Sequence, residues 1–251
     1  MARTLSESKF VLYLRSGLFL LLLALSAMVY ATLGLLSFLL PFERRYRLLT
    51  TWGGLSAWLC ARICGLNYRV MGLQNIPDRP CVILASHQST WETLVLSRLF
   101  PPLTWVVKRE LMWIPFFGWG LAMIEPIVID RRVGKRTSQQ LVQQGCKRLN
   151  EGRWVLIFPQ GTRVLPGEQR RYKLGGALLA ATTGVPVVPV AHNAGDFWPR
   201  HKFIKHPGMI TICIGPAVDS LGKSPQAINA EVKAWISATE ASIRIMNSKQ
   251  T

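Results

Sequence analysis

Charged side chains are scarce in this sequence, and acidic ones are the scarcest. Of its 251 residues, 17% are charged and 49% are hydrophobic, whereas soluble domains carry about 25% charged residues. This composition excludes an intrinsically disordered chain, a coiled coil and a collagen-like repeat. What remains is a globular protein that either has an unusually apolar surface or carries a membrane segment.

Cysteine is also sparse and irregularly placed. The five cysteines are Cys60, Cys64, Cys81, Cys146 and Cys213. Their odd number and scattered spacing argue against a disulfide framework, and no second Cys or His pair lies near Cys60 and Cys64 to suggest a zinc site. We therefore expect reduced, mostly buried thiols in a protein that faces the cytosol, and no metal.

Acidic residues number 13 against 30 Lys and Arg, which gives a formal charge of +17. Such an excess attracts nucleic acid, anionic lipid headgroups or phosphorylated substrates. The aromatic segment Val107–Leu121 could stack on bases, lie at a bilayer interface or belong to the core. Because the chain is rich in apolar residues and shows no nucleic-acid-binding motif, a lipid surface is favoured and nucleic acid is not expected as a partner.

A long uncharged stretch near the amino terminus predicts membrane attachment. Residues Ser16–Phe42 contain no charge, and as one helix they would extend roughly 40 Å, enough to cross a hydrocarbon core of ~30 Å. The run is too long for the apolar region of a cleaved signal peptide. A second, weaker apolar stretch lies at Leu48–Leu66. The two stretches could instead form a helical hairpin that inserts into one leaflet, and this arrangement is as well supported as a single spanning helix. A bend could lie at Gly34 or Pro41. We assign residues 1–66 to this anchor.

Residues 67–251 form one predicted α/β domain. Short apolar, β-branched runs alternate with helical patterns, which is typical of a mostly parallel sheet flanked by helices. The predicted strands are Cys81–Ala85, Leu103–Val107, Pro126–Ile129, Trp154–Phe158, Val185–Ala191 and Met209–Ile214. Two helices are predicted at Thr137–Leu149 and from Pro225 to Met246, the latter capped by Ser224.

One histidine stands out because it directly follows a predicted buried strand. His87 occupies the carboxyl end of that strand, where α/β sheets place catalytic groups, and Glu92 lies five residues later. A carboxylate beside an imidazole favours a general base. The pair can meet only if the chain turns at His87 and a helix starts just after it, and Ser89-x-x-Glu92 is a capping-box pattern that supplies this start. Glu92 as a mere helix cap remains the alternative.

A second group of polar residues follows the predicted strand at Trp154–Phe158. Gly161 permits close approach of the backbone, Thr162 offers a hydroxyl, and Arg163 offers a guanidinium suited to phosphate. Further basic residues follow before Gly175, where a helix is predicted to start. The segment therefore indicates an anion site, with a basic surface loop as the alternative. The other histidines, His192, His201 and His206, are interpreted as structural or solvated.

Four blocks in this order resemble the lysophosphatidic acid acyltransferases, also called 1-acyl-sn-glycerol-3-phosphate acyltransferases. The matching positions are His87 and Glu92; Lys108, Glu110, Leu111, Pro115 and Gly118; Phe158 to Arg163; and the Val/Pro-rich run Val185 to Val190. Glu92 stands where the family has Asp, and Gln160 where it has Glu. Both departures are compatible with acyl transfer, but they make the identity of the acyl acceptor less certain to infer from the sequence.

The resemblance implies a membrane-bound acyltransferase with a glycerol-phosphate acyltransferase-like fold. His87 would remove a proton from the sn-2 hydroxyl of 1-acyl-glycerol-3-phosphate, and Glu92 would orient His87. Lys108, Gln160, Gly161, Thr162 and Arg163 would bind the substrate. The co-substrate would be acyl-coenzyme A or acyl-acyl carrier protein, without a further cofactor.

The expected location is the cell inner membrane, with the active site facing the cytoplasm. The open alternatives are another lysolipid acceptor, such as lyso-ornithine lipid or lysophosphatidylglycerol, and a catalytically inactive lipid-binding relative. A basic nucleic-acid-binding protein is a third hypothesis, which the uncharged run disfavours.

Overall fold

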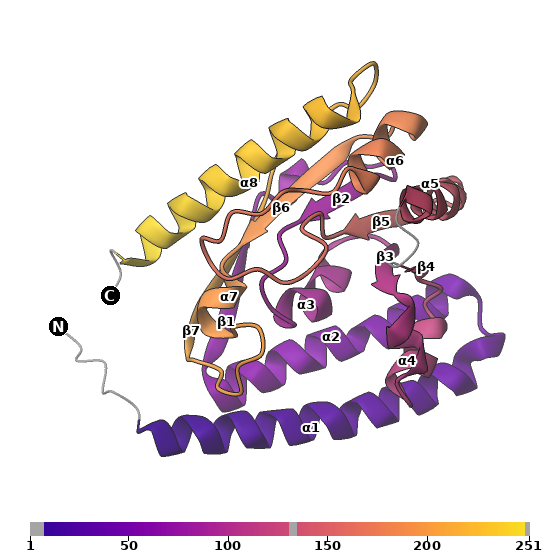
Figure 1. Ribbon diagram of the computed structural model, residues 1–251. Coiled ribbons are helices and arrows are strands. Elements are labelled where there is room, and N and C mark those ends of the chain that lie inside the picture. Colours follow the sequence, from indigo (N-terminus) through magenta and orange to yellow (C-terminus); the bar gives the residue numbers. More distant parts are fainter. Residues whose placement is uncertain (1–7, 131–134, 249–251) are drawn as a thin grey trace.

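A twisted sheet organises the part of the chain that the computed structural model describes, residues 8–130 and 135–248 (Figure 1). Its seven strands are β1 (Leu66–Met71), β2 (Val82–Ala85), β3 (Leu103–Lys108), β4 (Ile127–Ile129), β5 (Trp154–Ile157), β6 (Val187–His192) and β7 (Gly208–Ile214). They lie in the order β1-β7-β6-β2-β5-β3-β4. Every neighbouring pair is parallel except β6 and β7, which are antiparallel.

Helices cover both faces of the sheet, as Figure 1 shows. They are α1 (Lys9–Leu36), α2 (Phe42–Cys64), α3 (Trp91–Leu99), α4 (Phe117–Ala122), α5 (Lys135–Asn150), α6 (Gly175–Thr183), α7 (Ala194–Phe197) and α8 (Pro225–Ser248). Because strand side chains alternate in direction, Ile83 and Ala85 of β2 pack in a core with α1, α2 and α3. Val82 and Leu84 pack in a second core with α5, α6 and α8.

The predicted α/β class and the mostly parallel sheet are confirmed. The structure contains all six predicted strands and both predicted helices, and the Ser224 hydroxyl accepts a hydrogen bond from the Ala227 N–H at 3.2 Å at the start of α8. Strand β1 was not predicted. It lies at the sheet edge, where only Leu66 is buried, so its sequence has no apolar run that marks a strand.

The amino-terminal segment folds as a helical hairpin rather than as one isolated helix. Helices α1 and α2 lie side by side (Figure 1), and the Trp52 indole donates a hydrogen bond to the Ser26 hydroxyl at 3.0 Å. Pro41 directly precedes α2, whereas Gly34 lies inside α1, so the bend falls at Pro41. Within the described residues, one helical stretch, Lys9–Leu39, is long and apolar enough to cross a membrane.

The hairpin packs directly onto the sheet domain. A Cβ atom on Gly53 of α2 would lie 2.1 Å from the carbonyl oxygen of Leu94 in α3, so this position requires glycine. Phe19 of α1 and Tyr46 and Cys60 of α2 are buried in the same core as the strands. The boundary at residue 66 stays a prediction, and the structure shows that segments on its two sides share one hydrophobic core.

A cluster of charges fixes the tip of the hairpin to the domain. The Glu125 carboxylate accepts hydrogen bonds from Arg45 of α2 at 2.7 Å, from Arg148 of α5 at 3.0 Å and from Arg153 at 2.9 Å. Partial burial raises the pKa of Glu125, but these guanidinium groups outweigh it and hold the pKa below its ordinary value. Glu125 is therefore ionised at neutral pH and joins three elements.

Candidate active site

The site begins at the carboxyl end of β2, near the centre of the sheet. Strand β2 ends at Ala85, His87 lies in the following loop, and α3 starts at Trp91. The chain therefore turns after β2, as the sequence requires if His87 and Glu92 are to meet. Glu92 lies in the first turn of α3 and is fully buried.

His87 and Glu92 form a close pair. The His87 Nδ1 lies 2.8 Å from the Glu92 Oε1. Because an ionised carboxylate can only accept hydrogen bonds, Nδ1 carries the proton. Nε2 is then the ring nitrogen that can take up a proton when the imidazole is neutral, as a general base requires.

The Glu92 carboxylate also receives backbone hydrogen bonds. The N–H groups of Gln88 and Ser89 each donate to Oε1 at 2.9 Å, and that of Ser89 also lies 3.1 Å from Oε2. Burial would raise the pKa of Glu92, but the nearby His192 and the hydrogen bonds from His87 and the Ser89 N–H outweigh it and hold the pKa below its ordinary value. Glu92 is thus a buried anion at neutral pH.

Glu92 binds both the backbone that leads into α3 and the His87 ring. Glu92 reaches back to the Ser89 N–H, as in a capping box, but the Ser89 hydroxyl accepts from the Trp91 N–H at 3.2 Å. The same carboxylate therefore binds the backbone just before α3, whose N-cap residue is Thr90, and holds the His87 ring. The alternative that Glu92 only caps the helix is not what the geometry shows.

A second loop, residues 158–164 after β5, lies directly against the His87 loop. The Val164 N–H donates to the His87 carbonyl oxygen at 2.8 Å, and the Arg163 Nε donates to the Ser89 carbonyl oxygen at 2.9 Å. The Phe158 ring stacks on the His87 imidazole with centroids 4.1 Å apart. Among the described residues, the two terminal nitrogens of Arg163 have no hydrogen-bond or ion-pair partner, so they remain available to a ligand.

Gly161 shapes this second loop. Its φ of 72° lies in the left-handed region, and a Cβ atom there would lie 2.8 Å from the Lys173 Cε. Glycine adopts this conformation without steric cost. Glycine at this position therefore lets the loop pack closely against the Lys173 side chain.

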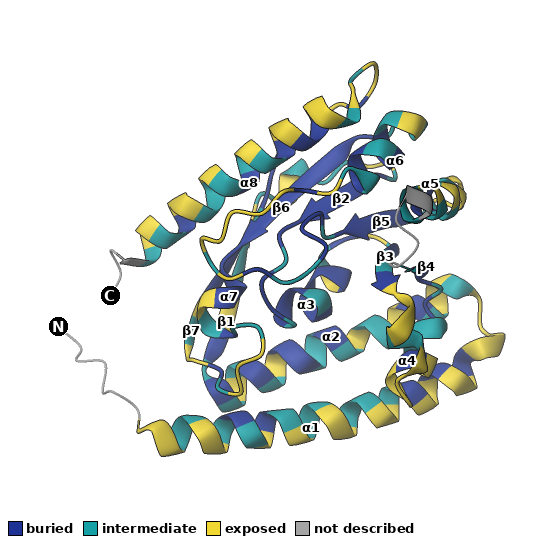
Figure 2. Ribbon diagram, viewed as in Figure 1, coloured by how far each residue is buried: buried dark blue, intermediate teal, exposed yellow. Residues whose placement is uncertain are grey.

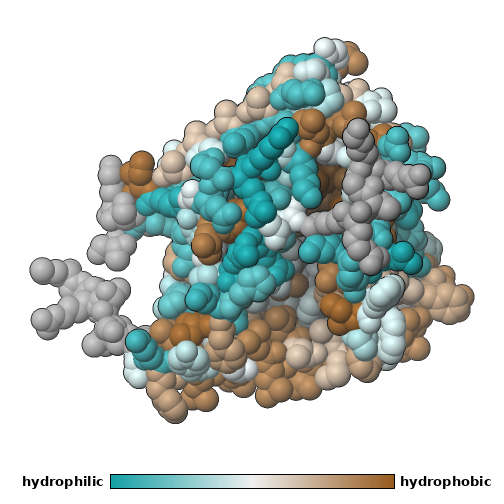
Figure 3. Space-filling model, in the orientation of Figure 1, coloured by the Kyte–Doolittle hydropathy of each residue, from teal (hydrophilic) through white to brown (hydrophobic). Residues whose placement is uncertain are grey.

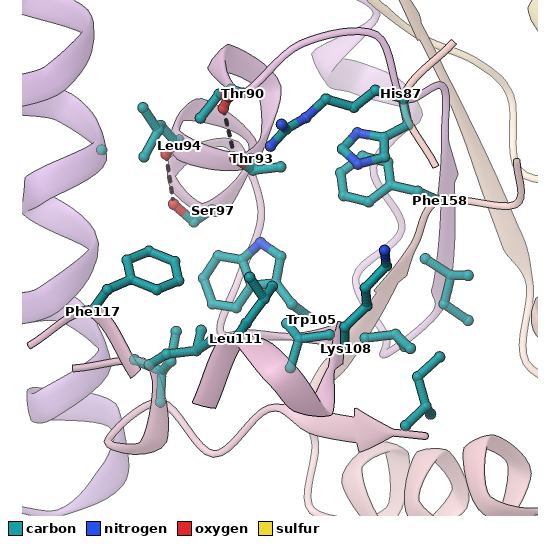
Figure 4. Close-up of a pocket in the computed structure, with 18 of the residues that line it drawn as sticks. His87, Thr90, Thr93, Leu94, Ser97, Trp105, Lys108, Leu111, Phe117 and Phe158 are labelled. Atoms are coloured by element: carbon teal, nitrogen blue, oxygen red, sulfur yellow. Dashed lines mark hydrogen bonds between the residues drawn. The ribbon is translucent and has the colours of Figure 1, made fainter. Parts of the chain in front are cut away.

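His87, Phe158, Gly161, Arg163 and Lys173 line one cavity of about 730 Å³. Its polar end contains His87, Lys108, Thr162, Arg163 and Lys173, and Figure 4 shows Lys108 pointing from β3 toward the His87 and Phe158 rings. The remainder is mainly apolar and includes side chains of α1, α2, α3 and α4: Leu23, Ala27, Leu49, Leu94, Phe117 and Leu121. The cavity thus joins a basic end to a long apolar end.

Four of the five predicted substrate-binding residues line the cavity, and one does not. Lys108, Gly161, Thr162 and Arg163 line the cavity. Gln160 does not. It is buried, and its Oε1 has no hydrogen-bond partner within residues 8–130 and 135–248. Its side chain does not reach the cavity surface.

Three further residues lie near the site, and two of them, His201 and Gln88, were not predicted from the sequence to take part in it. Lys173 and His201 line the cavity. Gln88 fixes the His87 loop, since its Nε2 donates to the Glu240 Oε1 at 2.8 Å and its Oε1 accepts from the Gly195 N–H at 3.1 Å. Lys173 belongs to the basic run after Arg163, which indicated an anion site in the sequence. Gln88 could not be found in this way, because its partners lie more than 100 residues away along the chain.

His192 is structural, as the sequence interpretation held. It is fully buried, its Nε2 lies 3.0 Å from the Ser86 carbonyl oxygen, and its Nδ1 accepts from the Ala194 N–H at 3.2 Å. Both ring nitrogens therefore serve to hold neighbouring backbone in place.

The geometry defines a class of protein. An imidazole held by a buried carboxylate, basic groups in the same cavity and an apolar extension suit a transferase that acts on an anionic, amphipathic substrate. The family model described as Acyltransferase matches residues 67–193. The chain belongs to the acyltransferase family, as the four sequence blocks indicated.

Individual relatives agree with this assignment. The chain is 48% identical over 235 residues to the 1-acyl-sn-glycerol-3-phosphate acyltransferase of Pseudomonas aeruginosa, covering 92% of this chain and 91% of that protein. It is 30% identical over 219 residues to a 1-acyl-sn-glycerol-3-phosphate acyltransferase of Chlamydomonas reinhardtii, covering 85% and 66%. The crystal structure of the 1-acyl-sn-glycerophosphate acyltransferase PlsC from Thermotoga maritima has the same fold, with a TM-score of 0.78, 21% identity and coverage of 92% and 95%.

Proposed function

We propose that this protein transfers an acyl group from a thioester to the sn-2 hydroxyl of 1-acyl-sn-glycerol 3-phosphate, which yields phosphatidic acid. One observation carries the proposal: the Glu92-bound His87 and the Arg163 guanidinium line the same cavity, whose other end is apolar. A lysolipid has a hydroxyl, a phosphate and an acyl chain, and the cavity offers a complementary group to each. The names of the Pseudomonas and Chlamydomonas relatives support this choice of acceptor.

His87 would act as general base and then as general acid. Its Nε2 takes the proton of the sn-2 hydroxyl as that oxygen forms a bond with the thioester carbonyl carbon. The tetrahedral intermediate then expels the thiolate, which takes the same proton back from Nε2. Glu92 stabilises the transient imidazolium, because a buried carboxylate 2.8 Å from Nδ1 interacts strongly with the charge that develops on the ring. The reaction requires no cofactor beyond the thioester.

The basic end of the cavity would hold the acceptor phosphate. Arg163 is tied through Nε to Ser89, so its two terminal nitrogens are oriented as a fork suited to phosphate oxygens. Lys108 adds positive charge from β3, and Gly161 and Thr162 shape the wall of the cavity. Fixing the phosphate fixes the glycerol backbone, which brings its hydroxyl to His87.

The proposal includes attachment to one face of a membrane. Helix α1 exposes a row of large apolar side chains that includes Leu14, Leu18, Leu21, Leu25 and Val29. Figure 2 shows exposed positions along the whole length of α1, and Figure 3 shows hydrophobic residues gathered along the edge where α1 lies. Because α1 lies along α2 and the domain, the hairpin would insert into one leaflet.

Exposed aromatic rings extend the same surface. Trp113, Phe116 and Trp119 are each more than two-fifths exposed, and amphipathic rings favour the membrane interface. We place the enzyme on the inner membrane with its active site facing the cytoplasm. Its partners are then the lipid bilayer and a coenzyme A or acyl carrier protein thioester.

Substitution of Arg163 tests the proposed function. Arg163→Ala removes two charge-assisted hydrogen bonds to phosphate, so we expect KM for the acceptor to rise about 10- to 100-fold while KM for the donor stays within twofold. Arg170→Ala is the matched control, because Arg170 is an exposed arginine of the following loop that does not line the cavity. Equal losses for donor and acceptor would contradict the phosphate role, and no product from any lysolipid with either thioester would contradict the activity.

A further inference from the structure

The segment 199–207, which joins α7 to β7, connects the membrane hairpin to the basic end of the cavity. At one end of this segment, the Lys205 N–H donates a hydrogen bond to the Ser16 hydroxyl of α1 at 2.9 Å, and Lys205 is 2% exposed. The Phe203 ring stacks on Tyr13 of α1, with centroids 5.6 Å apart. Because both rings are about half exposed, they extend the apolar surface of the hairpin.

The other end of the segment reaches the phosphate-binding loop. A terminal nitrogen of Arg200 donates a hydrogen bond to the carbonyl oxygen of Arg163. His201 follows and lines the same cavity as His87, Thr162 and Arg163. The segment is therefore fixed both to α1 and to the residue that we propose as the phosphate ligand.

The backbone of His201 has an uncommon conformation. Its φ is 58°, in the left-handed region, and it is one of three such non-glycine residues in the part of the chain that is described. Histidine tolerates this region better than most residues, but the conformation still costs free energy. Such residues cluster at ligand-binding positions, where the surrounding structure holds them in place. Here the contacts of Arg200 and Lys205 provide that support.

We propose that His201 is a further headgroup-binding residue, which donates a hydrogen bond to the acceptor phosphate and favours a phosphate monoester over a diester. The inference rests on the proposed function, because it names a ligand for the same cavity. A monoester offers three terminal oxygens, so Arg163, Lys108 and His201 can each find one. A diester such as lysophosphatidylglycerol has one fewer terminal oxygen, a smaller negative charge and a bulky substituent, so it serves the three donors less well.

Equilibrium binding and steady-state kinetics of purified His201→Gly test this role. Glycine adopts the left-handed conformation freely, so this variant removes the imidazole without straining the backbone. We expect the Kd and KM for 1-acyl-glycerol-3-phosphate to rise about tenfold, as for loss of one hydrogen bond to a charged group. The Kd for lysophosphatidylglycerol and the KM for the thioester should stay within twofold.

His206→Gly is the matched control, because His206 is an exposed histidine of the same segment that does not line the cavity. It loosens the segment similarly and should leave every constant unchanged. If His201→Gly binds the monoester like His206→Gly, or loses monoester and diester equally, the proposal is wrong. Binding is measured without turnover, so a wild-type protein that binds lysophosphatidate but makes no product would contradict the activity and not this inference.

Discussion

Replacing Glu92 by glutamine isolates the contribution of one buried charge to the proposed catalysis. The substitution keeps the length of the side chain and one acceptor oxygen, which can still receive hydrogen bonds from the Nδ1 of His87 and the backbone N–H groups of Gln88 and Ser89. It removes the negative charge that faces the imidazolium formed during the reaction. The expected effect is therefore on turnover, with little effect on binding.

The geometry gives the size of this effect. The Glu92 Oε1 lies 2.8 Å from the His87 Nδ1, so the two charge centres lie on the order of 4 Å apart. At an effective dielectric constant of about 20, this interaction is worth about 4 kcal/mol. We expect kcat to fall about a thousandfold in Glu92→Gln, with KM for both substrates changed less than threefold.

The assay measures formation of phosphatidic acid from a thioester and 1-acyl-glycerol-3-phosphate in detergent micelles. Glu92→Asp keeps the charge but shortens the reach, so it should retain more activity than Glu92→Gln. Glu231→Gln is the control, because Glu231 forms an exposed ion pair with Lys223 outside the cavity. A folded Glu92→Gln protein that keeps more than a tenth of wild-type kcat would refute the orienting and electrostatic role.

Three further substitutions test the structure around the site. Gly161→Ala forces a Cβ atom against Lys173 at a φ of 72°, so we expect KM for the acceptor to rise at least tenfold, measured by initial rates. Gly53→Ala places a Cβ atom against the Leu94 carbonyl oxygen, so it should lower the unfolding free energy by about 1–3 kcal/mol. Thermal denaturation measures this loss. An unchanged Tm would contradict the close contact between α2 and α3. Glu125→Gln should lower stability by about 1 kcal/mol at pH 7. Because its pKa is lowered on folding, this contribution is fully present above the ordinary value of 4.5 and is lost as the pH falls through the lower pKa of the folded state, so the difference between wild type and variant should shrink as the pH falls below 4.5.

Much of the fold follows from the sequence because its strands are buried on both faces. Strands β2 and β5 are continuous apolar runs with every residue buried, and such runs are visible without a structure. Edge strand β1 has mixed polarity and becomes a strand through its pairing with β7, which lies about 140 residues later. Long-range pairing of this kind leaves no local pattern.

The residues of the site likewise fall into those that the sequence could predict and those that it could not. His87, Glu92 and Arg163 follow strands that end at one edge of the sheet, so their meeting is a consequence of topology. Gln160 lies in the same motif, but it is buried and does not line the cavity, and which side chains of a loop face a cavity cannot be predicted from the sequence. His201 reaches the cavity through a segment whose course depends on contacts with α1. Its sequence shows only a basic loop.

The most direct test of the central claim is a crystal structure of the protein with bound 1-acyl-glycerol-3-phosphate. The account predicts that the phosphate contacts the terminal nitrogens of Arg163 and that the sn-2 hydroxyl lies within hydrogen-bond distance of the His87 Nε2. A phosphate bound elsewhere, or a hydroxyl directed away from His87 while the phosphate is held, would contradict it.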